Sequence, residues 1–354
     1  MFISTCGFGA TGSSAVTDYL RECEGIQVID KFEFRLPSAV DGLSDLEYHI
    51  MLSPARQSSS AYAIQRFEKL IGQYKKKWCA STSITAAEVD RITYEFLDQI
   101  TQVRYVSFSP RINKRHSEFL QRYVGESLIR RKIMPKLERK GIVKRNVDFY
   151  PLDEIRVSVC PPNFYEAAQT FVRDLLTGMG VDMEGNVAMD QAFVGNDPAR
   201  GFPFFTDPYA VVVDRDPRDL FIFARKKLFS VGRFMPSDTV ENFIAYYRIL
   251  RENQPYSRPN PRVLSIRFED MIYEYDATTA RINEFLGIRN LNPRSVFNPA
   301  HSVANTNLVT KFPDLRAETE QIAQALPEYL YPFEKYPDVS NEGKMFFGRA
   351  LRKR

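Results

Sequence analysis

The sequence predicts an α/β fold, in which a parallel sheet is flanked by helices and a helical insertion follows the second strand. The first observation is the opening order of an apolar strand, "FIST", a glycine-rich turn, a helix and a second strand, "IQVID", which is typical of a βαβ unit. The second is the helical spacing of apolar residues over much of 61–145. The third is a strand that ends in charge and leads into a helix, found in "YAVVVDRDPRDL" and again in "RVLSIRFEDM".

The same patterns predict the domain organisation. We expect residues 1–335 to form a single α/β domain, with a basic helical insertion at about 61–145, and residues 336–354 to form a basic C-terminal tail. Apolar spacing predicts three helices within the insertion, at 61–77, 85–103 and 117–140. Later elements are expected as a strand at 155–159 and helices at 164–176 and 240–251, with glycine caps at Gly178 and Gly287.

Composition indicates a soluble protein with a large core. The chain has 354 residues, of which 44% are hydrophobic, and no apolar run approaches the roughly 18 to 20 residues that cross a bilayer. The N-terminus lacks the pattern of a secretory leader. Its four cysteines are far apart, which favours a reducing compartment, and its three histidines are too scattered for a zinc site. We therefore expect a cytoplasmic protein, in peripheral contact at most with the inner face of the membrane.

Positive charge is concentrated in one segment. Between Arg111 and Arg145, twelve Lys or Arg accompany three Glu, although the whole chain carries a net charge of only +4. Such a segment is most often a solvated face, and the alternatives are contact with an acidic glycan, anionic lipid headgroups or a partner. The ending "FFGRALRKR" predicts either a frayed tail or a basic amphipathic contact with anionic lipids. No nucleic-acid recognition motif accompanies this charge, so we expect no nucleic-acid partner.

The turn "GFGATGSSAV" has the spacing of a phosphate-binding loop. Gly7 and Gly12 are separated by four residues, and Ser13 and Ser14 follow at the start of the predicted helix. Backbone N–H groups and the helix N-terminus meet there, so the turn can bind an anion and the predicted sheet is P-loop-like. Ser13 occupies the position of the lysine in a nucleotide-hydrolysing loop. The alternative is a glycine turn that only connects the strand to the helix.

A second charged turn is expected beside the first. Arg215 follows the apolar run "VVVD", and Asp216-Pro217 marks the start of a helix. The carboxyl ends of parallel strands meet at one edge of the sheet, where ligands of open α/β folds bind. An arginine there can hold a phosphate with two parallel hydrogen bonds. The alternative is an ion-pair cluster at the helix start, formed by Arg215 with Asp216, Arg218 and Asp219.

Together these motifs resemble the sulfotransferase family, in particular its bacterial, glycan-associated branch. The resemblance rests on the glycine loop, on "RDPRD" after an apolar strand, and on "RFEDM" before a helix that ends in "FLG". It covers about the first 35 residues and most of 203–287. The family implies a single sulfotransferase-like α/β domain, 3′-phosphoadenosine 5′-phosphosulfate (PAPS) as the sulfuryl donor, and no metal.

The resemblance also implies a donor site. Arg215 matches the arginine that grips the 3′-phosphate of the donor, with Arg218 as a further cation. Two positions depart from the family: Ala10 stands where a Lys or Arg stabilises the leaving phosphate, and Phe223 where a serine binds the 3′-phosphate. The 5′-phosphosulfate would be held by the loop residues Gly9, Ala10, Thr11, Gly12, Ser13 and Ser14.

Sulfuryl transfer to a hydroxyl needs a base near the sulfur. We expect Glu33, in "VIDKFEFRLP", to be this base, because some polysaccharide sulfotransferases that the sequence resembles carry a glutamate at the end of this strand. Asp30 and His49 are the alternatives. Lys31 and Arg35 alternate with Glu33 along the chain and would bind the substrate and stabilise charge.

Two later segments are expected to complete the site. In "DQAFVGNDPARGFPFF", Asp190 is expected to bind the acceptor, while the phenylalanines pack on the core. In "HSVANTNLVTKF", which lies where the family has a further donor-binding loop, the candidates are Asn305, Asn307 and Lys311.

These observations predict a nucleotide-binding sulfotransferase that moves a sulfuryl group from PAPS to a hydroxyl acceptor. The expected acceptor is a carbohydrate, as in polysaccharide or glycoconjugate biosynthesis. One alternative, favoured by Ala10 and Phe223, is a catalytically weakened protein of the same fold that binds a nucleotide or a glycan. Another is a phosphotransferase or nucleotide hydrolase, which would require a lysine in place of Ser13 and a metal-binding aspartate at a strand end.

Overall fold

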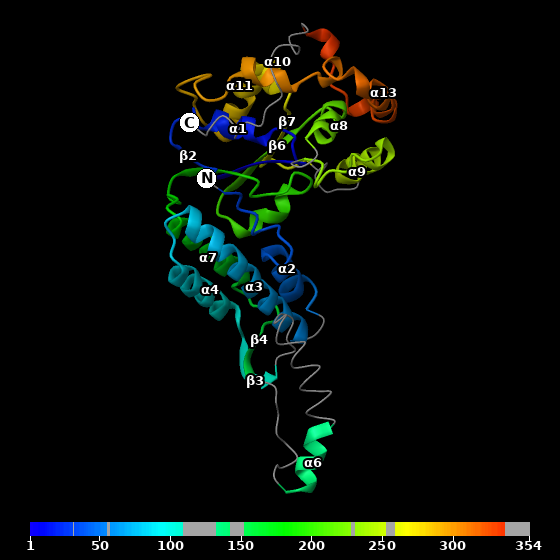
Figure 1. The fold of residues 1–354 in the computed structure, drawn as a ribbon. Coiled ribbons are helices and arrows are strands. Elements are labelled where there is room, and N and C mark those ends of the chain that lie inside the picture. The colour runs from blue at the N-terminus through cyan, green and yellow to red at the C-terminus, as the bar shows by residue number, and fades with distance from the viewer. Residues whose placement is uncertain are drawn as a thin grey trace.

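A five-stranded parallel sheet organises the upper half of the molecule as drawn in Figure 1. The computed structural model describes residues 1–30, 32–54, 57–108, 132–141, 152–227, 231–252 and 259–336. The strand order is β2-β5-β1-β6-β7, and every neighbouring pair is parallel. The predicted α/β class with a parallel sheet and flanking helices is therefore confirmed. The strands are β1 (Phe2–Gly7), β2 (Ile26–Ile29), β5 (Asn186–Asp190), β6 (Pro208–Asp214) and β7 (Val263–Arg267).

The sequence analysis missed strand β5. It lies between β1 and β2, so the two strands of the opening βαβ pattern are parallel but are not neighbours. The strand has five residues and contains Asn and Asp, so its local β propensity is weak. Its position inside the sheet, where four of its residues are buried, stabilises it instead. Because β5 and β6 flank β1, the glycine loop leaves the middle of the sheet's carboxyl edge.

Helices cover both faces of the sheet (Figure 1). On one face, α1 (Ser13–Leu20) and α11 (Tyr275–Leu286) pack on apolar side chains such as Ile3 of β1. As predicted, α11 ends at Gly287, whose φ of 64° lies in the left-handed region that glycine favours. The other helices of this part are α8 (Pro217–Lys226), α9 (Val240–Glu252), α10 (Asp270–Tyr273), α12 (Pro299–Ser302) and α13 (Arg316–Ala325). Short 3-10 turns lie at η3 (Pro198–Phe204), η5 (Val303–Asn305), η6 (Leu308–Thr310), η7 (Pro313–Leu315), η8 (Pro327–Tyr329) and η9 (Phe333–Lys335).

The predicted helical insertion packs against the opposite face of the sheet. Its aromatic centre is formed by Phe67, Phe96 and Phe171, whose ring centroids lie 4.6 to 5.7 Å apart. The same buried cluster continues to Phe2 of β1, so the insertion and the sheet share one core. Within the predicted range of about 61–145 the helices are most of α3 (Gln57–Ser81), α4 (Ala86–Ile100) and α6 (Met134–Arg139). Three further helical elements lie outside that range: α2 (Leu43–Glu47), the π-helical turn η1 (Tyr48–Leu52) and α7 (Phe164–Gly178), which carries Phe171.

Some predicted elements of the insertion differ in the structure. The strand expected at 155–159 is β4 (Leu152–Val157), which pairs with β3 (Val103–Phe108) in a separate antiparallel ribbon and not with the central sheet. The helix expected to end before Gly178 includes that residue, and Gly180 takes the left-handed conformation instead.

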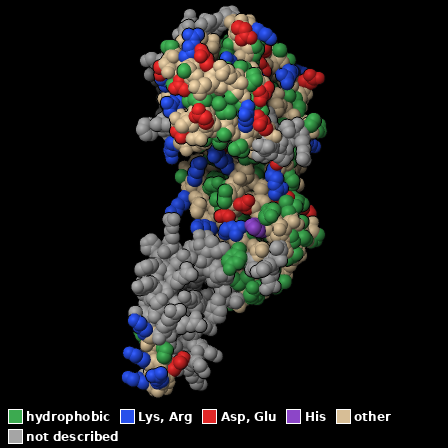
Figure 2. All heavy atoms as spheres, turned by 90° about the vertical axis from the view of Figure 1, so that its right-hand side faces the viewer, with side chains coloured by type: hydrophobic (Ala, Val, Ile, Leu, Met, Phe, Trp, Pro, Cys, Tyr) green, Lys and Arg blue, Asp and Glu red, His purple; other side chains and the backbone are tan. Residues whose placement is uncertain are grey.

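The basic segment is described only in part. Over 132–141, the side chains of Lys132, Lys136, Arg139 and Lys140 are exposed, and Figure 2 shows them together at the lower end of the molecule. The rest of the predicted 117–140 helix and the tail from 337 to 354 lie outside the described residues. Among the helices that the structure describes, none combines the length and apolar character needed to span a bilayer.

Candidate functional site

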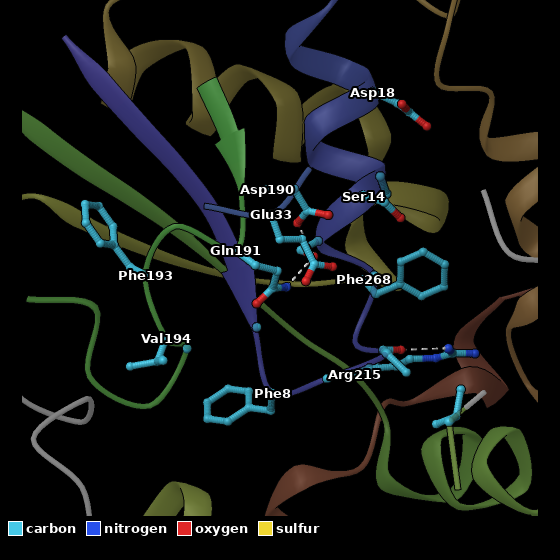
Figure 3. Close-up of a pocket in the computed structure, with 18 of the residues that line it drawn as sticks. Phe8, Ser14, Asp18, Glu33, Asp190, Gln191, Phe193, Val194, Arg215 and Phe268 are labelled. Carbon is cyan, nitrogen blue, oxygen red and sulfur yellow. Dashed lines mark hydrogen bonds between the residues drawn. The ribbon is translucent and has the colours of Figure 1, made fainter. Parts of the chain in front are cut away.

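A cavity of about 1100 Å³ opens at the carboxyl edge of the sheet, over the ends of β1, β5 and β6 (Figure 3). This is the edge where ligands bind in open α/β folds. The cavity brings together ten of the residues that the sequence analysis proposed for the site: Gly9, Ala10, Gly12, Ser13, Ser14, Glu33, Arg35, Asp190, Arg215 and Asn305.

The glycine loop has a backbone that few residues other than glycine adopt. Gly9 and Gly12 have φ angles of 90° and 97°. A Cβ atom at Gly12 would lie only 2.3 Å from the ring of Phe268, so a glycine is required there. Gly12 is also the N-cap of α1 and supplies no capping side chain. The first N–H groups of the helix therefore face the cavity as potential donors to an anion.

Thr11 differs from its predicted role. Its side chain is buried and is not part of the cavity lining. The Thr11 Oγ1 atom accepts a hydrogen bond of 3.2 Å from the backbone N–H of Phe8. The Thr11 side chain therefore closes the loop on itself and does not line the cavity.

Ala10 is strained in the loop, with a φ of 54°. A left-handed conformation costs a residue with a Cβ about 1 kcal/mol or more. We expect Ala10→Gly to raise the free energy of unfolding by about 1 kcal/mol, measured by urea denaturation. The matched control is Ala15→Gly inside α1, which should lower it by about 1 kcal/mol. A destabilised Ala10→Gly variant would contradict the strained loop geometry.

Ser13 is bound to the strand that the sequence analysis missed. Its Oγ donates a 2.9 Å hydrogen bond to Oδ1 of Asp190 and accepts one of 2.9 Å from Nε2 of Gln191 (Figure 3). A hydroxyl has one hydrogen, and here Asp190 takes it. The predicted role of Ser13 as a hydroxyl donor to a phosphate is therefore not the one seen, whereas Ser14 lines the cavity beside it. Asp190 lies beneath the loop, where it holds Ser13.

Arg215 is the most deeply buried cation of the cavity lining, with 2% of its surface exposed. One terminal nitrogen donates to the carbonyl of Ala10 at 3.3 Å, and the other donates to the carbonyl of Asn305. The remaining Nε–H is buried and has no hydrogen-bond partner among the described residues. A buried donor without a partner is costly, and Arg215 bears this cost within the lining of the cavity.

Phe223, one of the two departures from the family pattern, has a specific contact. The guanidinium carbon of Arg215 lies 4.9 Å from the Phe223 ring centroid and 5.0 Å from that of Phe268. Arg215 is therefore stacked between two aromatic rings, which attract a cation by their electron-rich faces. Burial lowers the pKa of Arg215, and nearby carboxylates, Asp219 first among them, oppose that shift.

Buried carboxylates surround this arginine. Burial, reinforced by the charge of Asp216, raises the pKa of Asp219 to about 8. Burial likewise raises the pKa of Glu269 to about 7, and Arg267 partly offsets that shift. Asp219 also accepts a 2.7 Å hydrogen bond from the N–H of Leu308. Arg215 thus belongs both to the cavity and to a buried ion cluster, as each of the two sequence interpretations proposed.

Glu33 and Arg35 lie on the cavity side of the segment after β2. The apolar residues that alternate with them are buried: Phe32, Phe34 and Leu36. The alternation of polar and apolar side chains therefore continues although β2 ends at Ile29. Glu33 and Arg35 form an ion pair of 2.5 Å. Glu33 therefore lies in the same cavity as the glycine loop, as its predicted role as a base requires.

Other predicted residues are placed elsewhere. Arg218 pairs with Asp216 at 2.6 Å, donates to the carbonyl of Tyr331, and does not line the cavity. Asp30 pairs with Arg21, and neither it nor His49 lines the cavity. Lys31 lies outside the described residues.

The segment "HSVANTNLVTKF" contributes only some of its predicted residues to the cavity. Asn305 lines the cavity, and its carbonyl binds Arg215. Lys311 donates to the carbonyl of Ala304 at 2.8 Å, and neither Lys311 nor Asn307 is part of the lining.

Sequence reasoning left out Phe268 and His301, both of which line the cavity. Phe268 follows β7 directly, so its place at a strand end was a usable signal. His301 lies on α12, just before the segment that contains Asn305. The lining also contains two arginines, Arg35 and Arg215, and three carboxylates, so it carries charges of both signs; the carboxylates are those of Asp18, Glu33 and Asp190.

Comparison with known proteins adds little to this description. No family model and no curated protein matches the chain. Among solved structures, the chain is similar to a sulfotransferase domain from the curacin biosynthetic pathway, with 13% sequence identity and a TM-score of 0.37. The alignment covers 93% of this chain and 98% of that one. A likeness of this strength does not by itself establish a relationship.

Proposed function

We propose that the protein transfers a sulfuryl group from PAPS to the hydroxyl of an acceptor, with a carbohydrate or a glycoconjugate as the acceptor class. The observation that carries this proposal is that Arg215, a deeply buried cation, lines the same cavity as the glycine loop and Glu33. A donor with phosphate groups at both ends of its ribose needs two anion sites. The loop N–H groups and Arg215 supply two candidates.

The chemistry assigned to these residues is an in-line displacement at sulfur. Glu33 removes the proton of the acceptor hydroxyl, and the acceptor oxygen forms a bond to sulfur. The bond between sulfur and the phosphate oxygen breaks, and its electron pair leaves with the nucleotide. N–H donors of the loop stabilise the charge that develops on the departing phosphate. The products are a sulfate ester and adenosine 3′,5′-bisphosphate.

Calorimetric titration with adenosine 3′,5′-bisphosphate tests the donor site. We expect wild-type protein to bind this product with micromolar affinity. Glu33→Gln should bind it within about twofold of wild type, because Glu33 is assigned to the acceptor, and should lose at least a hundredfold in transfer from PAPS. Failure of wild-type protein to bind would overturn the PAPS assignment. Tight binding without transfer to any hydroxyl acceptor would support the alternative of a nucleotide-binding protein without turnover.

A second candidate function is phosphate chemistry with a magnesium nucleotide. The position of Asp190 at the end of β5, beside the glycine loop, favours it, because a loop hydroxyl and a strand-end aspartate hold magnesium in many nucleotide hydrolases. Ser14, which lines the cavity, stands at the position of that hydroxyl. The absence of a lysine at position 13 counts against it. Tighter binding of ATP than of the bisphosphate, with a magnesium requirement that Asp190→Asn removes, would favour this candidate. Tighter binding of the bisphosphate without magnesium would favour sulfuryl transfer.

A further inference from the structure

One side of the cavity is lined by apolar and aromatic side chains. We call this set the apolar wall; it consists of Phe8, Val194, Phe234, Tyr246 and Leu250. In Figure 3, Phe8 and Val194 lie on one side of the glycine loop, and Asp18 and Phe268 lie on the other. The wall adjoins the loop directly, because Phe8 is itself a loop residue.

Helix α9 contributes two of these residues by its periodicity. Phe243, Tyr247 and Arg251, spaced four apart, are buried against the core. Tyr246 and Leu250 are also four apart and lie on the face of the helix that lines the cavity. An amphipathic surface helix would normally carry polar side chains outside its core stripe. This second apolar face of α9 is therefore turned toward the cavity.

Phe234 is the least protected member of the wall. Its side chain is 53% exposed, although its ring lies so close to Gly9 that a Cβ atom there would be 2.9 Å from it. Val194 is 36% exposed. Covering such side chains with an apolar group is favourable in water. The wall thus has unburied apolar surface at the place where a second ligand would meet the loop.

We infer that the hydroxyl-bearing ligand of this cavity is an amphiphile, whose polar head lies near Glu33 and Arg35 and whose alkyl chain lies on the apolar wall. The role of the head as sulfuryl acceptor rests on the proposed function, but the binding preference does not. A cavity of about 1100 Å³ exceeds the range of roughly 300 to 1000 Å³ typical of a single small ligand, so it can hold a nucleotide and part of a second molecule.

Two glucosides with the same head test this inference. In calorimetry without nucleotide, n-octyl β-glucoside below its micelle concentration should bind at least tenfold more tightly than methyl β-glucoside. Phe234→Ser should weaken octyl glucoside binding about tenfold and leave methyl glucoside unchanged. The matched control is Ile249→Ser, because Ile249 is 55% exposed on the same helix as Leu250 and does not line the cavity. It should change neither affinity.

Equal affinities for the two glucosides, or equal losses in the Phe234 and Ile249 variants, would overturn the inference. Should Phe234→Ser fail to fold, as judged by circular dichroism, Val194→Ser gives the same test at another exposed member of the apolar wall. Failure of the proposed function is distinguishable, because it is read from the bisphosphate titration. If octyl glucoside binds and the bisphosphate does not, the inference of an amphiphile site is supported and the proposal of PAPS as donor is rejected.

Discussion

Replacing Arg215 with methionine is expected to lower the free energy of unfolding by about 3 to 5 kcal/mol at pH 8. The variant loses hydrogen bonds to the carbonyls of Ala10 and Asn305 and the stacking on two aromatic rings. It also leaves the buried carboxylate of Asp219 without the charge of Arg215 that favours its ionised form. Urea denaturation followed by circular dichroism measures the loss. The same variant should bind adenosine 3′,5′-bisphosphate at least a hundredfold more weakly. This affinity is measured without urea, at a temperature where the variant is folded.

Arg218→Met is the control for this experiment. Arg218 neighbours the same cluster and pairs with Asp216, but its side chain is 21% exposed and lies outside the cavity. We expect a smaller loss of stability and an unchanged affinity for the bisphosphate. Equal loss of affinity in both variants would show that Arg215 acts through the fold and not through a contact with the ligand.

Stability is expected to fall as the pH rises from about 5 to 8. The pKa values of Asp219 and Glu269 are raised by burial to about 8 and about 7, whereas their unfolded values are near 4. Between the unfolded and the folded pKa values, these two carboxyl groups hold protons in the folded protein that they have lost in the unfolded chain. The sign of the linkage is therefore negative, and the free energy of unfolding should fall by about 1 kcal/mol or more per pH unit. Urea denaturation at half-unit steps of pH measures the slope.

Asp219→Asn isolates one of the two groups. The amide oxygen can still accept from the N–H of Leu308, but the side chain no longer ionises. The slope between pH 5 and 8 should be roughly halved, and the variant should exceed wild type in stability at pH 8. Asp314, an exposed residue that pairs with Lys226, provides the control: Asp314→Asn should leave the slope unchanged. A wild-type stability that rises over this range would refute the assignment.

Sequence patterns predicted most of the architecture because its elements carry local signals. The helical spacing of α4 and α7 and the apolar run of β6 identify each element without any knowledge of its neighbours. β5 and the pairing of β4 with β3 could not be predicted in the same way. A strand of five residues is specified by the strands beside it, and strand pairing depends on segments that are distant in sequence.

The site was predictable to the extent that strand ends mark the ligand edge of a parallel sheet. Ser14, Glu33 and Arg215 could be proposed on this ground, or with the help of a resemblance, and all three line the cavity. The hydrogen-bond partners of the loop side chains could not be predicted from the sequence. Ser13 was expected among the residues that hold the donor, but its hydroxyl donates to Asp190, which only the folded structure brings near.

The central position of β5 also constrains how the chain can fold. Ser13 and Asp190, which meet beneath the glycine loop, are separated by 177 positions in sequence. Until the chain has been synthesised past β5, neither edge of β1 has its native partner strand, because the neighbours of β1 are β5 and β6. Contacts of such long range are costly in loop-closure entropy and are formed slowly. The glycine loop is thus encoded near the start of the chain but can reach its final shape only after more than half of the chain has been made.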